Sequence, residues 1–186
     1  DGGINYSDDY NAQELNSYKL IYFEILLALQ IQKEDGTFIV KMFDLLYHIS
    51  VQLLYILYIC YDKVYIYKPN MSRTSNSEKY IICKGYKLNT DVINIMNKYN
   101  NNINKLYINI PETFSEEINK YNNYYIYNQI YSINNIINNI KTKLPTNKTP
   151  SILQIKKAIE WCTLYKLPIN YNSIYFKQAN TFSLSL

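Results

Sequence analysis

Residues 63–85 read KVYIYKPNMSRTSNSEKYIICKG, and this stretch decides the fold prediction. Runs of β-branched and aromatic residues predict one strand over Lys63–Tyr67 and another over Lys79–Lys84. The polar segment Lys68–Glu78 joins them, and Pro69 ends the first strand because proline cannot donate a ladder hydrogen bond. A loop without a helical crossover returns the chain antiparallel. We therefore expect the last strand to run opposite to its predecessor.

Upstream of this stretch the pattern alternates between helix and strand. Apolar residues at helical spacing predict a long amphipathic helix over Asn11–Lys33, which ends at Asp35-Gly36 because glycine accepts a positive φ. A short strand over Thr37–Val40 follows, and then a buried helix over Ser50–Tyr61 with Ser50 as its N-cap. This order predicts an α/β domain in which a right-handed crossover makes the first two strands parallel.

Beyond Leu88 the sequence becomes rich in asparagine and low in complexity. We expect a domain over residues 1–87 and a mainly helical, Asn-rich extension over residues 88–186. Loose helical spacing of apolar residues predicts helices near Val92–Tyr99, Asn122–Lys143 and Pro150–Tyr165. Thr149 is the expected N-cap of the last helix, with Pro150 at its first position.

Charge and cysteine usage exclude some classes of protein. The formal net charge of +4 permits a polyanionic partner without requiring one. The three cysteines are Cys60, Cys83 and Cys162, and their wide spacing argues against a disulfide framework or a zinc site. Because no basic segment is followed by an apolar leader, we expect a nuclear or cytoplasmic protein that is neither secreted nor membrane-bound.

Polar residues at the strand ends predict where chemistry occurs. In an open α/β sheet, ligands bind at the carboxyl ends of the parallel strands. Lys41 follows one such strand, Lys68 follows the next, and Asp1 precedes the first helix at the same edge. Because the returning strand begins at that edge, Glu78 is expected beside Lys41. We therefore expect a lysine flanked by carboxylates.

A lysine in such surroundings can serve as a general base. Desolvation by apolar neighbours lowers a lysine pKa, and an adjacent acid opposes this shift and orients the amine. A plainer interpretation is that Lys41 and Asp44 form an ion pair at the edge of the domain. Position in the sequence does not decide between the two.

Several motifs in residues 1–87 are shared with a known enzyme family. They are Asp1-Gly2-Gly3, Asn11-Ala12-Gln13-Glu14, Leu20, Phe38 to Asp44, Lys68-Pro69, Ser72-Arg73 and Asn76 to Gly85. With these motifs the chain resembles the FtsJ-type RNA ribose 2′-O-methyltransferases, and most of all the branch that methylates the first nucleotide of capped mRNA. The resemblance implies the C-terminal half of a Rossmann-like methyltransferase sheet.

The resemblance also implies a mechanism and a cofactor. Members of the family use a Lys-Asp-Lys-Glu tetrad, of which Asp1, Lys41 and Glu78 match three positions. Lys41 would deprotonate a ribose 2′-hydroxyl that attacks the methyl group of S-adenosylmethionine, while Asp1 and Gly2 would contact this cofactor. No metal is required, since the methyl donor is already a cation.

One departure from the family is large. The first lysine of the tetrad has no match, and the chain has only four glycines, Gly2, Gly3, Gly36 and Gly85, with no glycine-rich loop for the methyl donor. We therefore expect this chain to be the carboxyl-terminal portion of a longer enzyme, lacking most of the cofactor-binding half, with negligible methyl transfer by itself.

The polar loop predicts a contact with RNA. Its donors can face phosphate and ribose oxygens, and the only arginine of the chain can hold a phosphate through two hydrogen bonds. A solvated turn is the alternative. The expected RNA-binding residues are Lys68, Ser72, Arg73, Asn76 and Ser77.

Other candidates and functions stay open at this point. His48 lies in an apolar stretch, which favours a structural role. A later group of tyrosines could stack on bases, although helix packing explains it more simply. The protein could instead methylate ribosomal or transfer RNA, or be a non-catalytic remnant that binds RNA or a partner. The tyrosines are Tyr121, Tyr124, Tyr125, Tyr127 and Tyr131.

Overall fold

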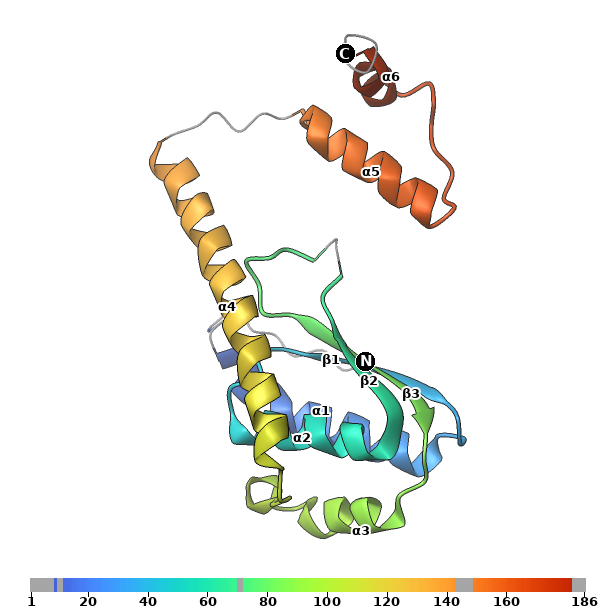
Figure 1. Cartoon of the computed structure of the whole chain (residues 1–186), viewed down its shortest axis with the longest axis vertical. Coiled ribbons are helices and arrows are strands. Elements are labelled where there is room, and N and C mark those ends of the chain that lie inside the picture. The colour runs from blue at the N-terminus through green and yellow to red at the C-terminus, as the bar shows by residue number, and fades with distance from the viewer. Residues whose placement is uncertain (1–8, 10–11, 70–71, 143–148, 182–186) are drawn as a thin grey trace. The chain divides into compact units, whose positions relative to one another are not determined.

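The structure is a computed structural model that describes residues 9, 12–69, 72–142 and 149–181 of the chain (Figure 1). Contacts divide the chain into two compact units, residues 1–138 and residues 139–186. The expected boundary after residue 87 falls inside the first unit, because the helices that follow it pack on the α/β part. Each unit is described by itself.

The first unit contains every element expected before residue 87. Observed ends differ from the expected ones by a few residues, and the two later strands are each extended by two residues at one end. In chain order the elements are α1 (Gln13–Ile31), β1 (Thr37–Met42), α2 (His48–Cys60), β2 (Tyr61–Tyr67), β3 (Lys79–Tyr86), α3 (Thr90–Tyr99), a 3-10 turn (Ile103–Lys105) and α4 (Glu112–Lys141).

The sheet has the strand order β1-β3-β2, and both of its ladders are antiparallel. The antiparallel last strand is as expected. The two earlier strands run in the same direction, but they do not form the parallel pair that the sequence suggested, because β3 lies between them and uses the hydrogen-bonding groups of both. The crossover through α2 therefore leaves room for one strand between β1 and β2.

The register of β3 sorts the side chains of the sheet onto two faces. Val40 pairs with Ile81 on one side of β3, and Val64 pairs with Cys83 on the other. Ile81 and Cys83 are fully buried. Since side chains alternate between faces along a strand, Lys41 and its partner Tyr80 lie on the opposite, more open face.

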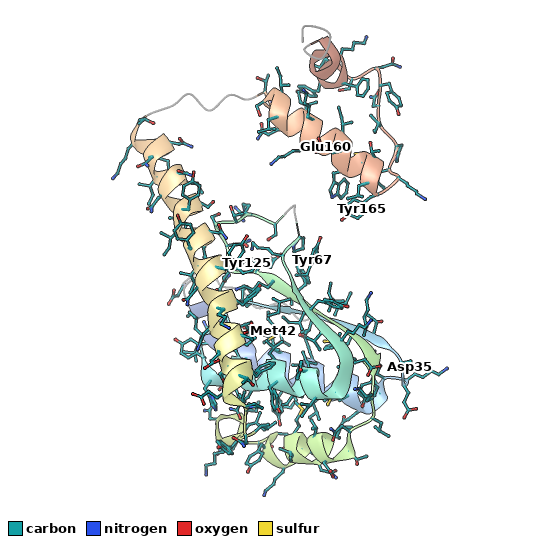
Figure 2. The ribbon with its side chains drawn as sticks, in the orientation of Figure 1. Asp35, Met42, Tyr67, Tyr125, Glu160 and Tyr165 are labelled. Carbon is teal, nitrogen blue, oxygen red and sulfur yellow. The ribbon has the colours of Figure 1, made fainter. Side chains whose placement is uncertain are left out.

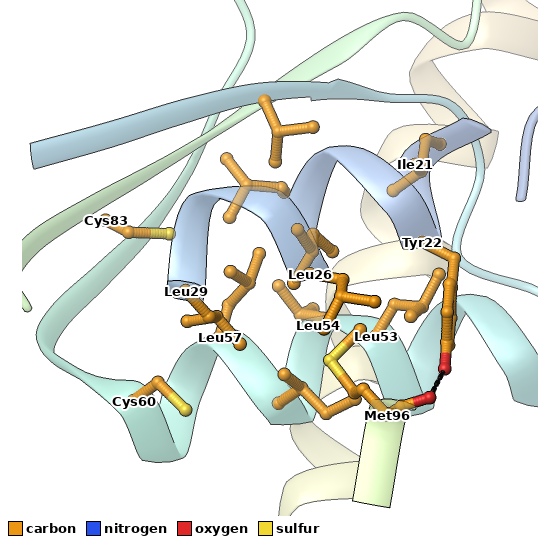
Figure 3. Packing of buried hydrophobic residues seen from close by; sticks show 14 of the residues in the cluster. Ile21, Tyr22, Leu26, Leu29, Leu53, Leu54, Leu57, Cys60, Cys83 and Met96 are labelled. Atoms are coloured by element: carbon orange, nitrogen blue, oxygen red, sulfur yellow. Dashed lines mark hydrogen bonds between the residues drawn. The ribbon is translucent and has the colours of Figure 1, made fainter. Parts of the chain in front are cut away.

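Helices α1 and α2 cover the apolar face and build the core, shown from close by in Figure 3. Leu29 from α1 and Leu57 from α2 are fully buried there. The phenol of Tyr22 is also buried and donates a hydrogen bond to the carbonyl of Met96, which ties α3 to the same core. Burial raises the pKa of the Cys60 thiol to about 11, which keeps it protonated at neutral pH.

Three details of capping and turn geometry differ from the expectations. Asp35, rather than Gly36, takes the positive φ of 62° after α1. Helix α2 begins at His48 with Tyr47 as its N-cap, so Ser50 lies inside the helix. In the second unit, Ser151 instead of Thr149 caps α5 through a reciprocal capping box with Gln154.

The described part of the second unit is helical. After the last residues of α4, its helices are α5 (Ile152–Leu164) and α6 (Ile174–Thr181), and Pro150 precedes α5 instead of opening it. The helix expected from Asn122 begins ten residues earlier, at Glu112 in α4. Among the helices that the structure describes, none combines the length and the apolar character needed to cross a membrane.

Candidate functional site

Three polar residues lie close together in the sheet, where β1 ends and β3 begins. Lys41 lies directly opposite Tyr80 in the β1–β3 ladder, and Met42 lies opposite Lys79. Glu78 immediately precedes Lys79, so it lies at the diagonal of Lys41, a spacing of about 7–8 Å between backbones that long side chains can bridge. The ladder therefore brings the expected base and one expected acid to the same edge.

Tyr80 lies opposite Lys41 in the ladder and interacts with Glu78, and it was not identified from the sequence. Its side chain hydrogen-bonds to Glu78, and burial, followed by the charge of Glu78, raises the pKa of the phenol. The ammonium of Lys41 lies 5.9 Å from the centroid of the Phe43 ring. The described part of the chain has no ion pair between Lys41 and Glu78.

Asp44 pairs with Lys79, not with Lys41. The Lys79 ammonium lies 3.2 Å from a carboxylate oxygen of Asp44 and 3.4 Å from the carbonyl of Phe43. Lys79 is only 2% exposed. The plainer interpretation of Lys41 is therefore wrong about its partner, because the ladder turns Lys79 to the covered face and Lys41 to the open one.

A buried carboxylate on α1 supports the loop that follows Lys41. An oxygen of Glu14 accepts hydrogen bonds from the backbone amides of Leu46 and Tyr47, both at 2.9 Å. These amides lie just before the first residue of α2, so Glu14 supplies the acceptor for the loop that leads into this helix. Burial raises the pKa of this carboxyl, although bonds from Ser50 and the two amides oppose the shift.

Lys68 organises the β2–β3 loop. Its ammonium donates to the carbonyl of Glu78 at 2.8 Å, and to the carbonyl and side-chain oxygen of Asn76 at 2.9 and 2.8 Å. A longer contact of 3.4 Å reaches the hydroxyl of Ser72. Burial and the nearby charge of Lys79 lower the pKa of Lys68. Three residues expected to bind RNA thus hold one another in place.

The β2–β3 loop forms one side of a groove of about 530 Å³, and α4 forms the other side. Thr74 donates a hydrogen bond of 2.8 Å to the hydroxyl of Ser132 on α4. Ser77 is buried and lines the groove, whereas Arg73 is exposed on the loop. Figure 2 shows Tyr125 projecting from α4 on the side of the loop.

The remaining expected site residues are Asp1 and Gly2, which lie outside the described residues. A cavity of about 670 Å³ adjoins Lys41, and its other lining includes Leu27, Ile31 and Ile39. Its few polar side chains do not match the adenine, ribose and amino-acid groups of S-adenosylmethionine. Within residues 9, 12–69, 72–142 and 149–181, no cluster of His, Cys, Asp or Glu could hold a metal ion.

The part of the chain that builds this site is also the part that matches a known protein family. Residues 1–86 match the FtsJ-like methyltransferase family. That range carries Lys41, Glu78 and Tyr80 and ends at the last residue of β3. The helices from α3 onward lie outside the match.

Curated relatives agree with this family. The first is the cap-specific mRNA (nucleoside-2′-O-)-methyltransferase 1 of Danio rerio, 42% identical over 93 residues, which are 50% of this chain and 11% of that protein. Proteins of the same name from Homo sapiens and Caenorhabditis elegans are 44% identical over 91 residues and 38% identical over 105 residues, covering 49% and 56% of this chain. The chain spans about one ninth of the length of these three relatives, since each match covers 11% of the relative.

Proposed function

We propose that this chain supplies the RNA-methylating edge of an S-adenosylmethionine-dependent ribose 2′-O-methyltransferase that acts on the first nucleotide of capped mRNA. The observation that carries the proposal is the convergence of Lys41, Tyr80 and Glu78 at one edge of the sheet, inside the segment that matches the family. The choice of capped mRNA as the substrate and of the ribose 2′-oxygen as the methyl acceptor rests on the names of the similar proteins.

Lys41 is the proposed general base. Its place at the end of β1 lets its amine, when neutral, accept the proton of a 2′-hydroxyl as that oxygen attacks the methyl group. Glu78 and the proposed partner Asp1 then stabilise the ammonium that forms. Tyr80 positions Glu78 through their hydrogen bond.

The β2–β3 loop is the proposed RNA contact. Lys68 holds the loop through its bonds to Asn76 and Glu78, which leaves the exposed guanidinium of Arg73 as the main phosphate ligand. Ser72, Asn76 and Ser77 line the groove beside it. RNA held by this loop would have its backbone near the end of β3 where Glu78 lies, and this is the strand that pairs with the strand of Lys41.

The methyl donor requires residues beyond those that surround the described cavity. S-adenosylmethionine supplies the methyl group when it is bound, and we propose that Asp1 and Gly2 contact it together with segments of a longer protein. The described residues then handle the acceptor: they position the RNA and take up one proton.

A chimera tests the function. The segment of about 91 residues that matches the Homo sapiens relative would replace its counterpart in that enzyme. Cap-dependent transfer of a labelled methyl group to a capped oligonucleotide is expected, with little transfer to the uncapped one. The same chimera with Lys41→Arg is the control, and it should bind RNA yet transfer no methyl group. A folded, cofactor-binding chimera without activity would refute the proposal.

A further inference from the structure

Helix α4 lies outside the segment that matches the family, yet it completes the groove beside the β2–β3 loop. Its lower part is fixed by Asn122, which donates a hydrogen bond of 2.7 Å to the carbonyl of Leu45. Its middle part is fixed to the loop by the bond between Thr74 and Ser132, and by Gln129, which reaches the carbonyl of Ser75 at 3.4 Å. These contacts hold α4 in a fixed position as one side of the groove, which we call its second wall.

The wall carries a regular stripe of aromatic and amide side chains. Tyr124, Asn128, Tyr131 and Asn135 all line the groove, and their spacing of four, three and four residues places them on one face of the helix. The two tyrosines are exposed, at 65% and 62%. They are about 10 Å apart along the helix axis, from the rise of 1.5 Å per residue.

The structure assigns different roles to the tyrosines of this helix. Tyr121 and Tyr125 pack beside the buried ammonium of Lys79, whose distance to each ring centroid is 5.9 and 5.8 Å. Tyr127 is 71% exposed and does not line the groove. Tyr124 and Tyr131 are the most exposed of the described tyrosines that line the groove, and the ring of Tyr124 also packs edge-on against that of Tyr125, with 5.2 Å between the centroids.

The charges around the groove suit a polyanion. Residues 121–140 of α4 contain no aspartate or glutamate, and the facing loop, residues 68–78, carries Lys68 and Arg73 against a single acid, Glu78. A phosphate backbone entering the groove would meet cations on one wall and no acid on the other. Single-stranded nucleic acids are bound by this combination of a positive groove and aromatic rings.

The composition of the lining favours RNA over a protein partner. Among the described residues that line the groove there is no Leu, Ile, Val, Phe or Met, and Pro69 is the only aliphatic one. Protein interfaces normally have an apolar centre. Hydroxyl, amide and phenol groups instead match the sugars and bases of a nucleotide.

We propose that α4 forms the second wall of a single-stranded RNA groove, in which Tyr124 and Tyr131 stack on nucleotides that flank the methylated one. The amides of Asn128 and Asn135 bond to base edges or ribose hydroxyls, while Arg73 on the loop holds a phosphate. This inference rests on the proposed function and extends the RNA site beyond the family segment.

Binding of RNA to the full chain of 186 residues tests the inference. The probe is a fluorescein-labelled single-stranded RNA of about ten nucleotides, a length within the usual site sizes, read by fluorescence anisotropy. Tyr124→Ala and Tyr131→Ala should each weaken binding about 10-fold, the effect of one lost base stack. Tyr127→Ala is the matched control, since it removes an equally exposed tyrosine of the same helix, and binding should not change.

The salt dependence of RNA affinity distinguishes the contribution of the loop from that of α4. Arg73→Ala should reduce the slope of log affinity against log salt by about 1, whereas the tyrosine variants should keep the wild-type slope. If Tyr124→Ala and Tyr131→Ala bind like Tyr127→Ala while Arg73→Ala binds weakly, RNA follows the loop alone and the inference is overturned. Absence of RNA binding by the wild-type chain would overturn it as well.

The methyl-transfer activity of the chimera tests the proposed function independently of the RNA-binding measurements on the variants. It contains only the segment matched to the relative, so its activity does not depend on α4. A chimera that methylates capped RNA, together with tyrosine variants that bind normally, would retain the function and reject the second wall. Circular dichroism of each variant checks that α4 is still helical.

Discussion

Lys41 and Tyr80 lie directly opposite each other in the β1–β3 ladder, on the face of the sheet that α1 and α2 leave open. This pairing matters because the phenol of Tyr80 also bonds to Glu78, which places a carboxylate within side-chain reach of the lysine. A register shift of one residue would turn Lys41 to the covered face. The ladder thus sets the chemistry of this edge.

Tyr80→Phe in the chimera tests the positioning role of the phenol. Without its hydrogen bond, Glu78 can rotate away from Lys41, so we expect kcat to fall about 10-fold, the upper range for one lost hydrogen bond. The KM for RNA should be unchanged, because Tyr80 does not line the groove. Single-turnover methylation kinetics measure both. A fall in RNA affinity with unchanged kcat would contradict this role.

Asp44→Asn tests the buried ion pair. The change leaves the Lys79 ammonium buried without a carboxylate, so we expect the free energy of unfolding to fall by about 3 kcal/mol. Lys79→Met should cost less, because Asp44 keeps 30% of its side chain exposed to water and can be solvated. Urea unfolding at neutral pH measures both variants.

An exposed pair of the same chain provides the control for this prediction. Lys87 and Asp62 are closer, at 2.8 Å, but their side chains are 58% and 56% exposed. Asp62→Asn should therefore change the free energy of unfolding by less than about 1 kcal/mol. Equal losses for Asp44→Asn and Asp62→Asn would show that burial of Lys79 does not determine the cost.

The elements of the first 87 residues were predictable because each carries a local signal. Apolar residues at helical spacing mark α1, and β-branched residues between polar segments mark β1 and β3. The direction of β3 followed from its loop connection. Strand order did not follow, because no local signal states that β3 lies between β1 and β2.

The contacts that complete the site were not predictable, since they join residues far apart in the sequence. Glu14 accepts hydrogen bonds from the amides before α2. Lys79 forms its ion pair with Asp44 because the ladder turns the Lys79 side chain to the covered face of the sheet. The early start of α4 was missed as well. Its first turns hold three acids with few apolar residues, and their helix is fixed by tertiary contacts such as Phe114 with Tyr55.

Lys68→Met tests whether this lysine holds the β2–β3 loop. The variant keeps an apolar stem but loses the hydrogen bonds to Asn76 and Glu78, so local opening of the loop should become easier. We expect amide hydrogen exchange over residues 72–78 to accelerate about 10-fold, the effect of about 1.4 kcal/mol. Exchange in α2 should not change, and equal acceleration there would indicate global destabilisation instead.

Glu14→Gln tests the buried carboxyl through the pH dependence of stability. Because burial raises the pKa of Glu14 above its ordinary value of 4.5, the folded state binds this proton more tightly than the unfolded state. Its contribution to stability is therefore fully present below 4.5 and is lost as the pH rises through the folded-state pKa. Glutamine keeps an oxygen for the amides of Leu46 and Tyr47 and does not titrate.

Urea unfolding of both proteins from about pH 4 to about pH 8 should show the wild type losing stability relative to Glu14→Gln as the pH rises. Glu116→Gln, which removes an exposed carboxylate of α4, controls for the change in net charge. Glu14→Ala should be less stable than Glu14→Gln at every pH, because it leaves the two amides before α2 without an acceptor. A wild type that gains stability over Glu14→Gln with rising pH would show that the amides, and not burial, dominate this carboxyl.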